Sequence, residues 1–154
     1  MNIINDCINV VITLIYNCKL FTNNYSLLYA AREINNYKSF WCVEKIENAK
    51  LQFEILHKRK PKTAIMGLAF KPNIDDLRES PAKYIAQKIL QNAQNEVHFI
   101  VEPNIKSHKF FKLTDTQTAI EQADIVVFLV AHDEFKNIQL SDDTIVLDFC
   151  GILK

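Results

Sequence analysis

The chain has 154 residues, of which 49% are hydrophobic, and its 18 basic and 18 acidic residues give a formal net charge of zero. This length and apolar content fit one domain with an added helix. The charges are balanced and interspersed, which argues against a nucleic-acid-binding surface. Four cysteines without a CxxC pair or zinc spacing, and four separated histidines, indicate a reducing compartment such as the cytoplasm and no metal site.

Residues 1–25 contain an apolar run, Cys7 to Tyr16, and the segment as a whole is left unassigned. The run is shorter than the roughly 20 residues that a membrane span needs. It lacks the basic region and the small-residue cleavage site of a signal peptide, so a buried strand or a packed helical turn is expected instead. The sequence has no glycine before Gly67, so no GxGxxG dinucleotide fingerprint precedes that position.

Residues 26–60 show the longest helical pattern, in which apolar side chains recur at steps of three, four or seven residues. We expect a helix that Ser26 caps and that ends in the basic residues before Pro61. Its length suggests a break at Asn35–Asn36. Two interpretations of the apolar stripe remain open: packing against the core of the same chain, or pairing with the same helix of a second copy.

The stretch from Thr63 to Pro81 organises the rest of the chain. Ala64 to Phe70 is an apolar run typical of a strand buried on both faces. A charged loop follows, with Lys71 and Arg78 suited to an anion, and Ser80 and Pro81 are expected to cap and begin the next helix. The loop also carries three acidic side chains, so ordinary surface ion pairs are the alternative interpretation. These acids are Asp75, Asp76 and Glu79.

The remaining 61–154 region alternates strands and helices, which predicts an α/β, Rossmann-like parallel sheet with helices on both faces. We expect helices over 82–92 and 115–123, and strands over 96–101, 124–130 and 144–149, with 124–130 central in the sheet. Phe110 and Phe111 are expected to anchor the irregular segment 105–113. The strand ends should gather four polar side chains at one edge, where open sheets bind ligands. These are Lys71, Glu102, His132 and Asp148, although a surface position is the favoured interpretation for His132.

The motif GLAFKP at residues 67–72, followed by IDDLRESPA at 74–82, resembles the C-terminal domain of the UDP-glucose/GDP-mannose dehydrogenase family. The closest resemblance is to its UDP-N-acetyl-D-mannosamine branch. HDEF at 132–135 adds to the likeness, and Asn73 departs from it, because an acid is expected there. The sequence AAREIN at 30–35 resembles the family's central helix, which forms its dimers.

The resemblance implies a domain that holds the UDP part of a UDP-sugar, while a separate N-terminal lobe holds NAD. In such enzymes two hydride transfers oxidise the sugar C6 alcohol to a carboxylate through a cysteine-bound intermediate. By motif, Phe70 and Lys71 would bind the substrate and Arg78 would reach NAD. Cys7 lies near the expected place of the nucleophile without its glycine-rich surroundings, so it is either a relic of that residue or a small buried side chain. Cys150 stands where the family tends to have a basic residue.

The sequence therefore predicts the C-terminal, UDP-sugar-binding part of such a dehydrogenase, with the dimer-forming helix attached and without the NAD lobe. Such a part should not turn over substrate alone, because the dinucleotide fingerprint is missing from it. The alternatives are a non-catalytic interaction or dimerisation module, or a truncated remnant. The expected partners are a UDP-sugar and a second copy or a separate NAD lobe, with neither nucleic acid nor membrane involved.

Overall fold

The computed structural model describes residues 25–93 and 95–153, so the predictions for residues 1–24, including Cys7, fall outside it. The described part of the chain begins with the helix α2, which spans Tyr25–His57. The helix runs unbroken through Asn35–Asn36, so the expected break is wrong. Neither proline nor glycine interrupts this stretch, and an asparagine inside a helix costs only about 0.7 kcal/mol. Ser26 is already helical and is therefore not the cap that we expected.

The end of α2 matches its sequence signals. Lys58 adopts a left-handed φ of 56°, and its N–H donates to the carbonyl of Glu54 over 2.9 Å. This is the usual way in which a helix closes its last turn before a change of direction. Pro61 follows and leads into the sheet.

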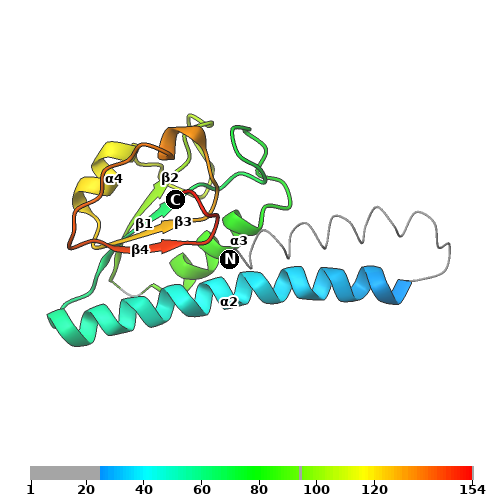
Figure 1. Ribbon diagram of the computed structural model, residues 1–154, viewed down its shortest axis with the longest axis horizontal. Coiled ribbons are helices and arrows are strands. Elements are labelled where there is room, and N and C mark those ends of the chain that lie inside the picture. Colours follow the sequence, from blue (N-terminus) through cyan, green and yellow to red (C-terminus); the bar gives the residue numbers. More distant parts are fainter. Residues whose placement is uncertain (1–24, 94, 154) are drawn as a thin grey trace.

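Four parallel strands form one sheet, in the order β2-β1-β3-β4 (Figure 1). They span Lys62–Met66 (β1), Val97–Val101 (β2), Ile125–Phe128 (β3) and Ile145–Asp148 (β4). The expected Rossmann-like parallel sheet is confirmed, and β3 is an inner strand as predicted. The strand at Ala64 is shorter than expected, because Gly67 turns the backbone out with a φ of 93°. An alanine Cβ at that position would lie 2.6 Å from the Cβ of Val130, so the turn requires glycine.

Helices cover both faces of the sheet, as predicted. On one face α2 and α3 (Pro81–Asn92) pack over the β1 side chain of Ile65 and its neighbours. On the other face α4 (Thr116–Gln122) and the short helix η2 (Asp133–Phe135) cover Ala64 and Met66. Alternate residues of one strand thus enter two separate cores, as expected for a buried parallel strand.

The two ends of α2 differ in their surroundings. Its C-terminal half lies along the sheet and buries Cys42, Ile46 and Phe53, whereas its N-terminal half extends beyond the sheet (Figure 1). Lys50 fixes the packed half with two carboxylates, at 2.6 Å from Glu96 and 3.0 Å from Glu47. None of the helices in the described part of the chain is both long and apolar enough to cross a membrane.

Candidate functional site

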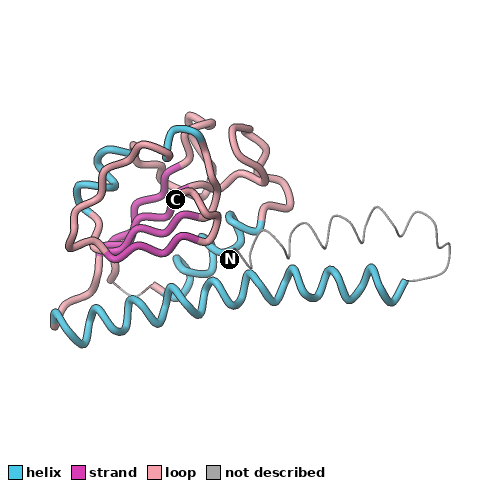
Figure 2. The backbone as a smooth tube through the Cα atoms, viewed as in Figure 1, coloured by secondary structure: helices cyan, strands magenta, loops and turns pink. Residues whose placement is uncertain are grey.

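The carboxyl ends of the four strands meet at one edge of the sheet, where loops replace regular structure (Figure 2). The segments that leave this edge are 67–80 after β1, 102–104 after β2, 129–135 after β3 and 149–153 after β4. Ligands of open α/β sheets bind outside this edge. The side chains there therefore decide what the domain can bind.

Glu102 is the buried anchor of this edge, with 4% of its surface exposed. Its Oε2 accepts the N–H groups of Leu68 at 2.7 Å and Ala69 at 2.9 Å, and lies 3.2 Å from the Nε2 of His132. Its Oε1 accepts the N–H of Asn104 at 3.1 Å. Burial acts to raise the pKa of Glu102, but the hydrogen bonds from His132, Leu68 and Asn104 outweigh it and lower the pKa from 4.5 to about 2. Glu102 is thus a fixed carboxylate at neutral pH.

His132 is fully enclosed, with 1% exposed, so the expected surface position is wrong. Its Nδ1 accepts the N–H of Asn73 over 3.0 Å and lies 2.9 Å from the side-chain nitrogen of Asn104. An Nδ1 that accepts from a backbone N–H leaves the proton on Nε2, which then donates to Glu102. The ring can be buried because both of its nitrogens have partners.

The loop between β1 and α3 folds back on itself. The N–H of Phe70 donates to the carbonyl of Asp76 over 2.8 Å, and the hydroxyl of Ser80 donates to the carbonyl of Leu68 over 2.6 Å. Ser80 also accepts the N–H of Lys83, which confirms it as the helix cap, with Pro81 at the first helical position. The loop therefore has a defined shape rather than that of a loose connection.

The side chains predicted for binding lie on the outside of this loop. Phe70 is 49% exposed, and the Nζ of Lys71 sits 5.9 Å from the centre of its ring. Lys71 forms no ion pair with the residues that the structure describes. Arg78 differs, because its guanidinium makes a two-pronged contact with Asp76 at 3.0 and 2.8 Å. That contact lowers the pKa of Asp76 to about 2 and leaves the Arg78 side chain 89% exposed.

The fourth predicted edge residue, Asp148, and the nearby Cys150 have separate roles. Asp148 accepts the N–H groups of Gly151 at 2.7 Å and Leu153 at 3.0 Å, and so folds the segment after β4. Within the described residues its hydrogen bonds go to residues 150–153 and to neither Glu102 nor His132. Burial, together with Asp148, raises the pKa of the Cys150 thiol to about 12, so this thiol is not activated.

The segment 105–113 is held by one phenylalanine rather than two. Phe111 is buried, as expected, but Phe110 is 73% exposed.

Sequence reasoning missed the residues that tie the loop to the sheet. Asn73 and Asp133 exchange two hydrogen bonds, from Asp133 N–H to the Asn73 amide oxygen at 2.9 Å and from the Asn73 amide nitrogen to Asp133 at 2.8 Å. Asn73 has a left-handed φ of 61°, which asparagine tolerates better than most residues. That tolerance is a local signal, beside its departure from the acid that the resemblance led us to expect, that could have suggested a structural role for Asn73.

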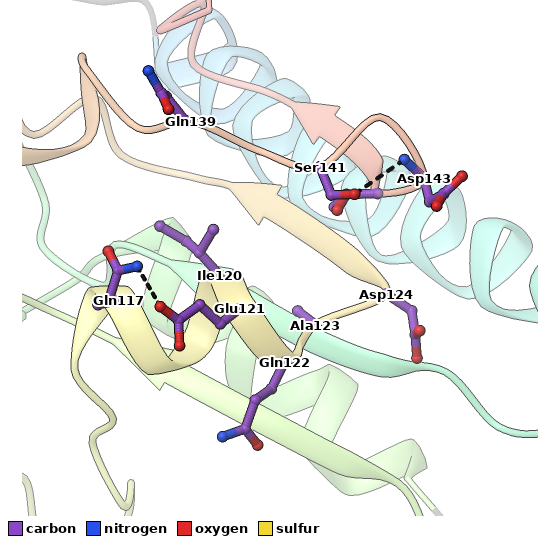
Figure 3. A pocket seen from close by; sticks show the side chains of 10 residues that line it. Gln117, Ile120, Glu121, Gln122, Ala123, Asp124, Gln139, Ser141 and Asp143 are labelled. Carbon is purple, nitrogen blue, oxygen red and sulfur yellow. Dashed lines mark hydrogen bonds between the residues drawn. The ribbon is translucent and has the colours of Figure 1, made fainter.

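A surface pocket of about 350 Å³ lies at the opposite edge of the sheet, before β3 and β4 (Figure 3). It is polar, and Glu121, Asp124 and Asp143 contribute carboxylates to its rim. Asp124 is already bound to the guanidinium of Arg59, at 2.7 Å for both contacts. The pocket lies far from the motif residues and contains none of them. Among the described residues, no group of three or more histidine, cysteine or acidic side chains is arranged to hold a metal ion.

The chain is similar in sequence to curated UDP-N-acetyl-D-mannosamine dehydrogenases. It is 41% identical to the enzyme of Campylobacter jejuni over 135 residues, which cover 83% of this chain and 31% of that protein. It is 44% identical to the enzyme of Salmonella typhi over 120 residues, which cover 73% of this chain and 28% of that protein. The chain thus spans about a third of the length of these relatives.

The fold is also that of a solved dehydrogenase. The UDP-N-acetyl-mannosamine dehydrogenase Cap5O from Staphylococcus aureus matches with a TM-score of 0.62 and 24% identity, over 85% of this chain and 35% of that one. The family model described as "UDP-glucose/GDP-mannose dehydrogenase family, UDP binding domain" matches residues 64–154. This range includes all of the parallel sheet except the first two residues of β1. The motif, the sheet and this match agree: the chain belongs to the UDP-glucose/GDP-mannose dehydrogenase family.

Proposed function

We propose that this chain is the UDP-sugar-binding part of an NAD-dependent dehydrogenase that oxidises the C6 alcohol of a UDP-N-acetylmannosamine-type sugar. The family match to a UDP binding domain over residues 64–154 supports the nucleotide part of this proposal. The names of the relatives, at about 40% identity, support the sugar.

The observation that carries the proposal is the exposed pair Phe70 and Lys71 on a loop whose base is fixed by buried groups. Glu102 holds the backbone at Leu68 and Ala69, one residue before the pair. Lys71 has no ion-pair partner among residues 25–93 and 95–153, and it lies at the sheet edge where such folds bind nucleotides, so it suits a diphosphate. Phe70 offers an apolar face beside it for the base or the sugar ring.

The dinucleotide part of the reaction needs more than the described residues supply. The 154-residue sequence contains two glycines, Gly67 and Gly151, and therefore no GxGxxG fingerprint. NAD would accept the hydride when bound, and Arg78 is the residue here that would reach it. Its Nη1 is not used in the contact with Asp76 and is available for an anion. We therefore expect this chain to bind a UDP-sugar but not to reduce NAD by itself.

Titration of UDP by calorimetry tests the proposal. We expect wild-type protein to give binding heat and Lys71→Ala to weaken the affinity at least tenfold, as expected for loss of a charge-assisted contact of about 1.5–3 kcal/mol. Lys62→Ala is the matched control, because Lys62 is an exposed lysine at the start of β1, the end of that strand opposite to the loop that carries Lys71. Absence of heat from the wild type would contradict the proposal, and so would equal losses from the two variants.

We also propose that α2 pairs with the α2 helix of a second copy. Five of its large apolar side chains are more than half exposed and lie on one side of the helix by their spacing. They are Tyr29, Tyr37, Phe40, Leu51 and Ile55. Such a stripe is typical of a surface that becomes buried in an assembly.

Light scattering after size-exclusion chromatography tests this pairing. We expect a dimer mass at micromolar concentration and a monomer mass for the double variant Leu51→Lys/Ile55→Lys. Replacing Lys45 by glutamate is the control and should leave the mass unchanged, because Lys45 is an exposed, charged residue that lies on another side of the same helix by its spacing. A monomeric wild type would refute the pairing without touching the nucleotide proposal.

A further inference from the structure

One asparagine connects the binding loop to the far side of the sheet edge. In the described part of the chain, every hydrogen bond between loop residues 71–79 and the segment after β3 involves Asn73. The remaining hydrogen bonds of this loop are local, such as those between Arg78 and Asp76. The position of the loop tip relative to the sheet therefore depends on this residue.

The contact has a buried base. Asn73 donates its backbone N–H to Nδ1 of His132, and His132 in turn donates from Nε2 to the carboxylate of Glu102. Glu102 accepts the N–H groups of Leu68 and Ala69, which lie at the start of the same loop. The loop is thus held at its start and at its tip by one connected set of buried groups.

We propose that Asn73 is a positioning residue for Lys71, acting through His132 and Asp133 as a latch on the loop. This inference rests on the proposed UDP-sugar binding by Lys71, two residues away. Holding the backbone at Asn73 restricts the directions that Lys71 can take before a ligand arrives. Restriction in the free protein reduces the entropy lost on binding, which raises affinity without a new contact to the ligand.

The pair Asn73–Asp133 offers a test by exchange of donor and acceptor. Asn73→Asp sets two carboxylates against each other at the position of the 2.8 Å hydrogen bond. Asp133→Asn alone keeps the contact, because an asparagine at 133 can turn its oxygen toward the Asn73 amide. The double variant Asn73→Asp/Asp133→Asn restores the hydrogen bond with donor and acceptor reversed, and it keeps the N–H of residue 133 as a donor to residue 73.

The four proteins are titrated with UDP by calorimetry, and their melting temperatures are recorded alongside. We expect Asn73→Asp to weaken UDP binding by about three- to tenfold, the effect of losing a largely exposed polar contact. Asp133→Asn should bind within about twofold of the wild type, and the double variant should return to that range. Unchanged affinity in Asn73→Asp, or a double variant that remains as weak as Asn73→Asp, would overturn the latch.

Amide hydrogen exchange of the free proteins separates this inference from the proposed function. The N–H of Asn73 should be protected in the wild type and in the double variant but not in Asn73→Asp. If the Asn73 amide shows this protection but the wild type binds no UDP, the proposed nucleotide binding is refuted. The claim that Asn73 positions Lys71 for UDP is then refuted too, while the hydrogen-bonded contact of Asn73 with His132 and Asp133 stands. A wild-type Asn73 amide that exchanges as fast as an unstructured one overturns the latch whatever UDP does.

Discussion

Replacing Glu102 by glutamine removes the negative charge that accepts hydrogen bonds from the loops at the carboxyl edge of the sheet, while the size of the side chain stays almost the same. The two oxygens of Glu102 accept hydrogen bonds from Leu68, Ala69, His132 and Asn104. A glutamine has one oxygen and one NH2 group, so its NH2 group would face N–H donors at one of the two positions that the carboxylate oxygens of Glu102 occupy. We expect Glu102→Gln to be destabilised for this reason.

The size of the effect follows from the pKa of Glu102, which is lowered from 4.5 to about 2. That shift corresponds to about 3 kcal/mol of stability that is present above pH 4.5 and is lost as the pH falls toward 2. Since whole domains are stable by about 5–15 kcal/mol, such a loss is readily measured. Glu102→Gln should therefore be about 3 kcal/mol less stable than the wild type at pH 7, and the difference should shrink as the pH approaches 2.

Urea unfolding of both proteins at several pH values between 2 and 7 is the appropriate assay. Comparison with the variant removes the contribution of the other carboxylates, which lose stability in acid in both proteins. Glu33→Gln serves as the control, because Glu33 is exposed on α2, and it should follow the wild type at every pH. A constant difference between Glu102→Gln and the wild type across the whole pH range would refute the electrostatic argument and leave only a packing effect.

Three further predictions concern other buried or constrained residues. Gly67→Ala should lower the free energy of unfolding by about 3–5 kcal/mol, because alanine would have to adopt a left-handed φ of 93° and its Cβ would lie 2.6 Å from the Cβ of Val130. Chemical denaturation measures this free energy, and an unchanged midpoint would contradict the close approach to Val130. Ser80→Ala should cost about 1–3 kcal/mol in the same assay, since it removes a helix cap and a buried donor, and Ser80→Thr should retain most of that stability if the hydroxyl is responsible. Burial raises the pKa of the Cys42 thiol to about 11, and burial together with Asp148 raises that of Cys150 to about 12. Iodoacetamide at pH 8 should therefore label both cysteines far more slowly in the native protein than in urea, which peptide mapping would show. Rapid labelling of either cysteine in the native protein would mean that its thiol is not enclosed.

The fold could be predicted because its signals are local and repeated. Apolar runs such as Ile125–Phe128, separated by helix-forming segments, leave few alternatives to a parallel sheet. The errors in strand length have a physical cause. Leu68 and Ala69 are as apolar as a strand and fully buried, but their N–H groups bond to Glu102 rather than to a neighbouring strand.

The candidate site was only partly predictable, since its decisive contacts join residues distant in sequence. Lys71 and Ser80 stand in a motif that can be seen directly in the sequence. The burial of His132 depends on Glu102 and Asn73, which are 30 and 59 residues away along the chain. An isolated histidine is usually exposed, and the partners that allow this one to be buried become visible only once the strands are arranged.

The separation of these partners has a consequence for the order of folding. The hydrogen bonds that join Glu102 to Leu68 and to His132, and His132 to Asn73, close chain segments of 30 to 59 residues. Because closing such long segments costs entropy, we expect these bonds to form only after β2 and β3 have joined β1. The tip of the loop after β1, around Asn73, should accordingly be among the last parts of the molecule to acquire its native shape. In a refolding experiment, protection of the Asn73 amide should appear later than protection of the β1 amides.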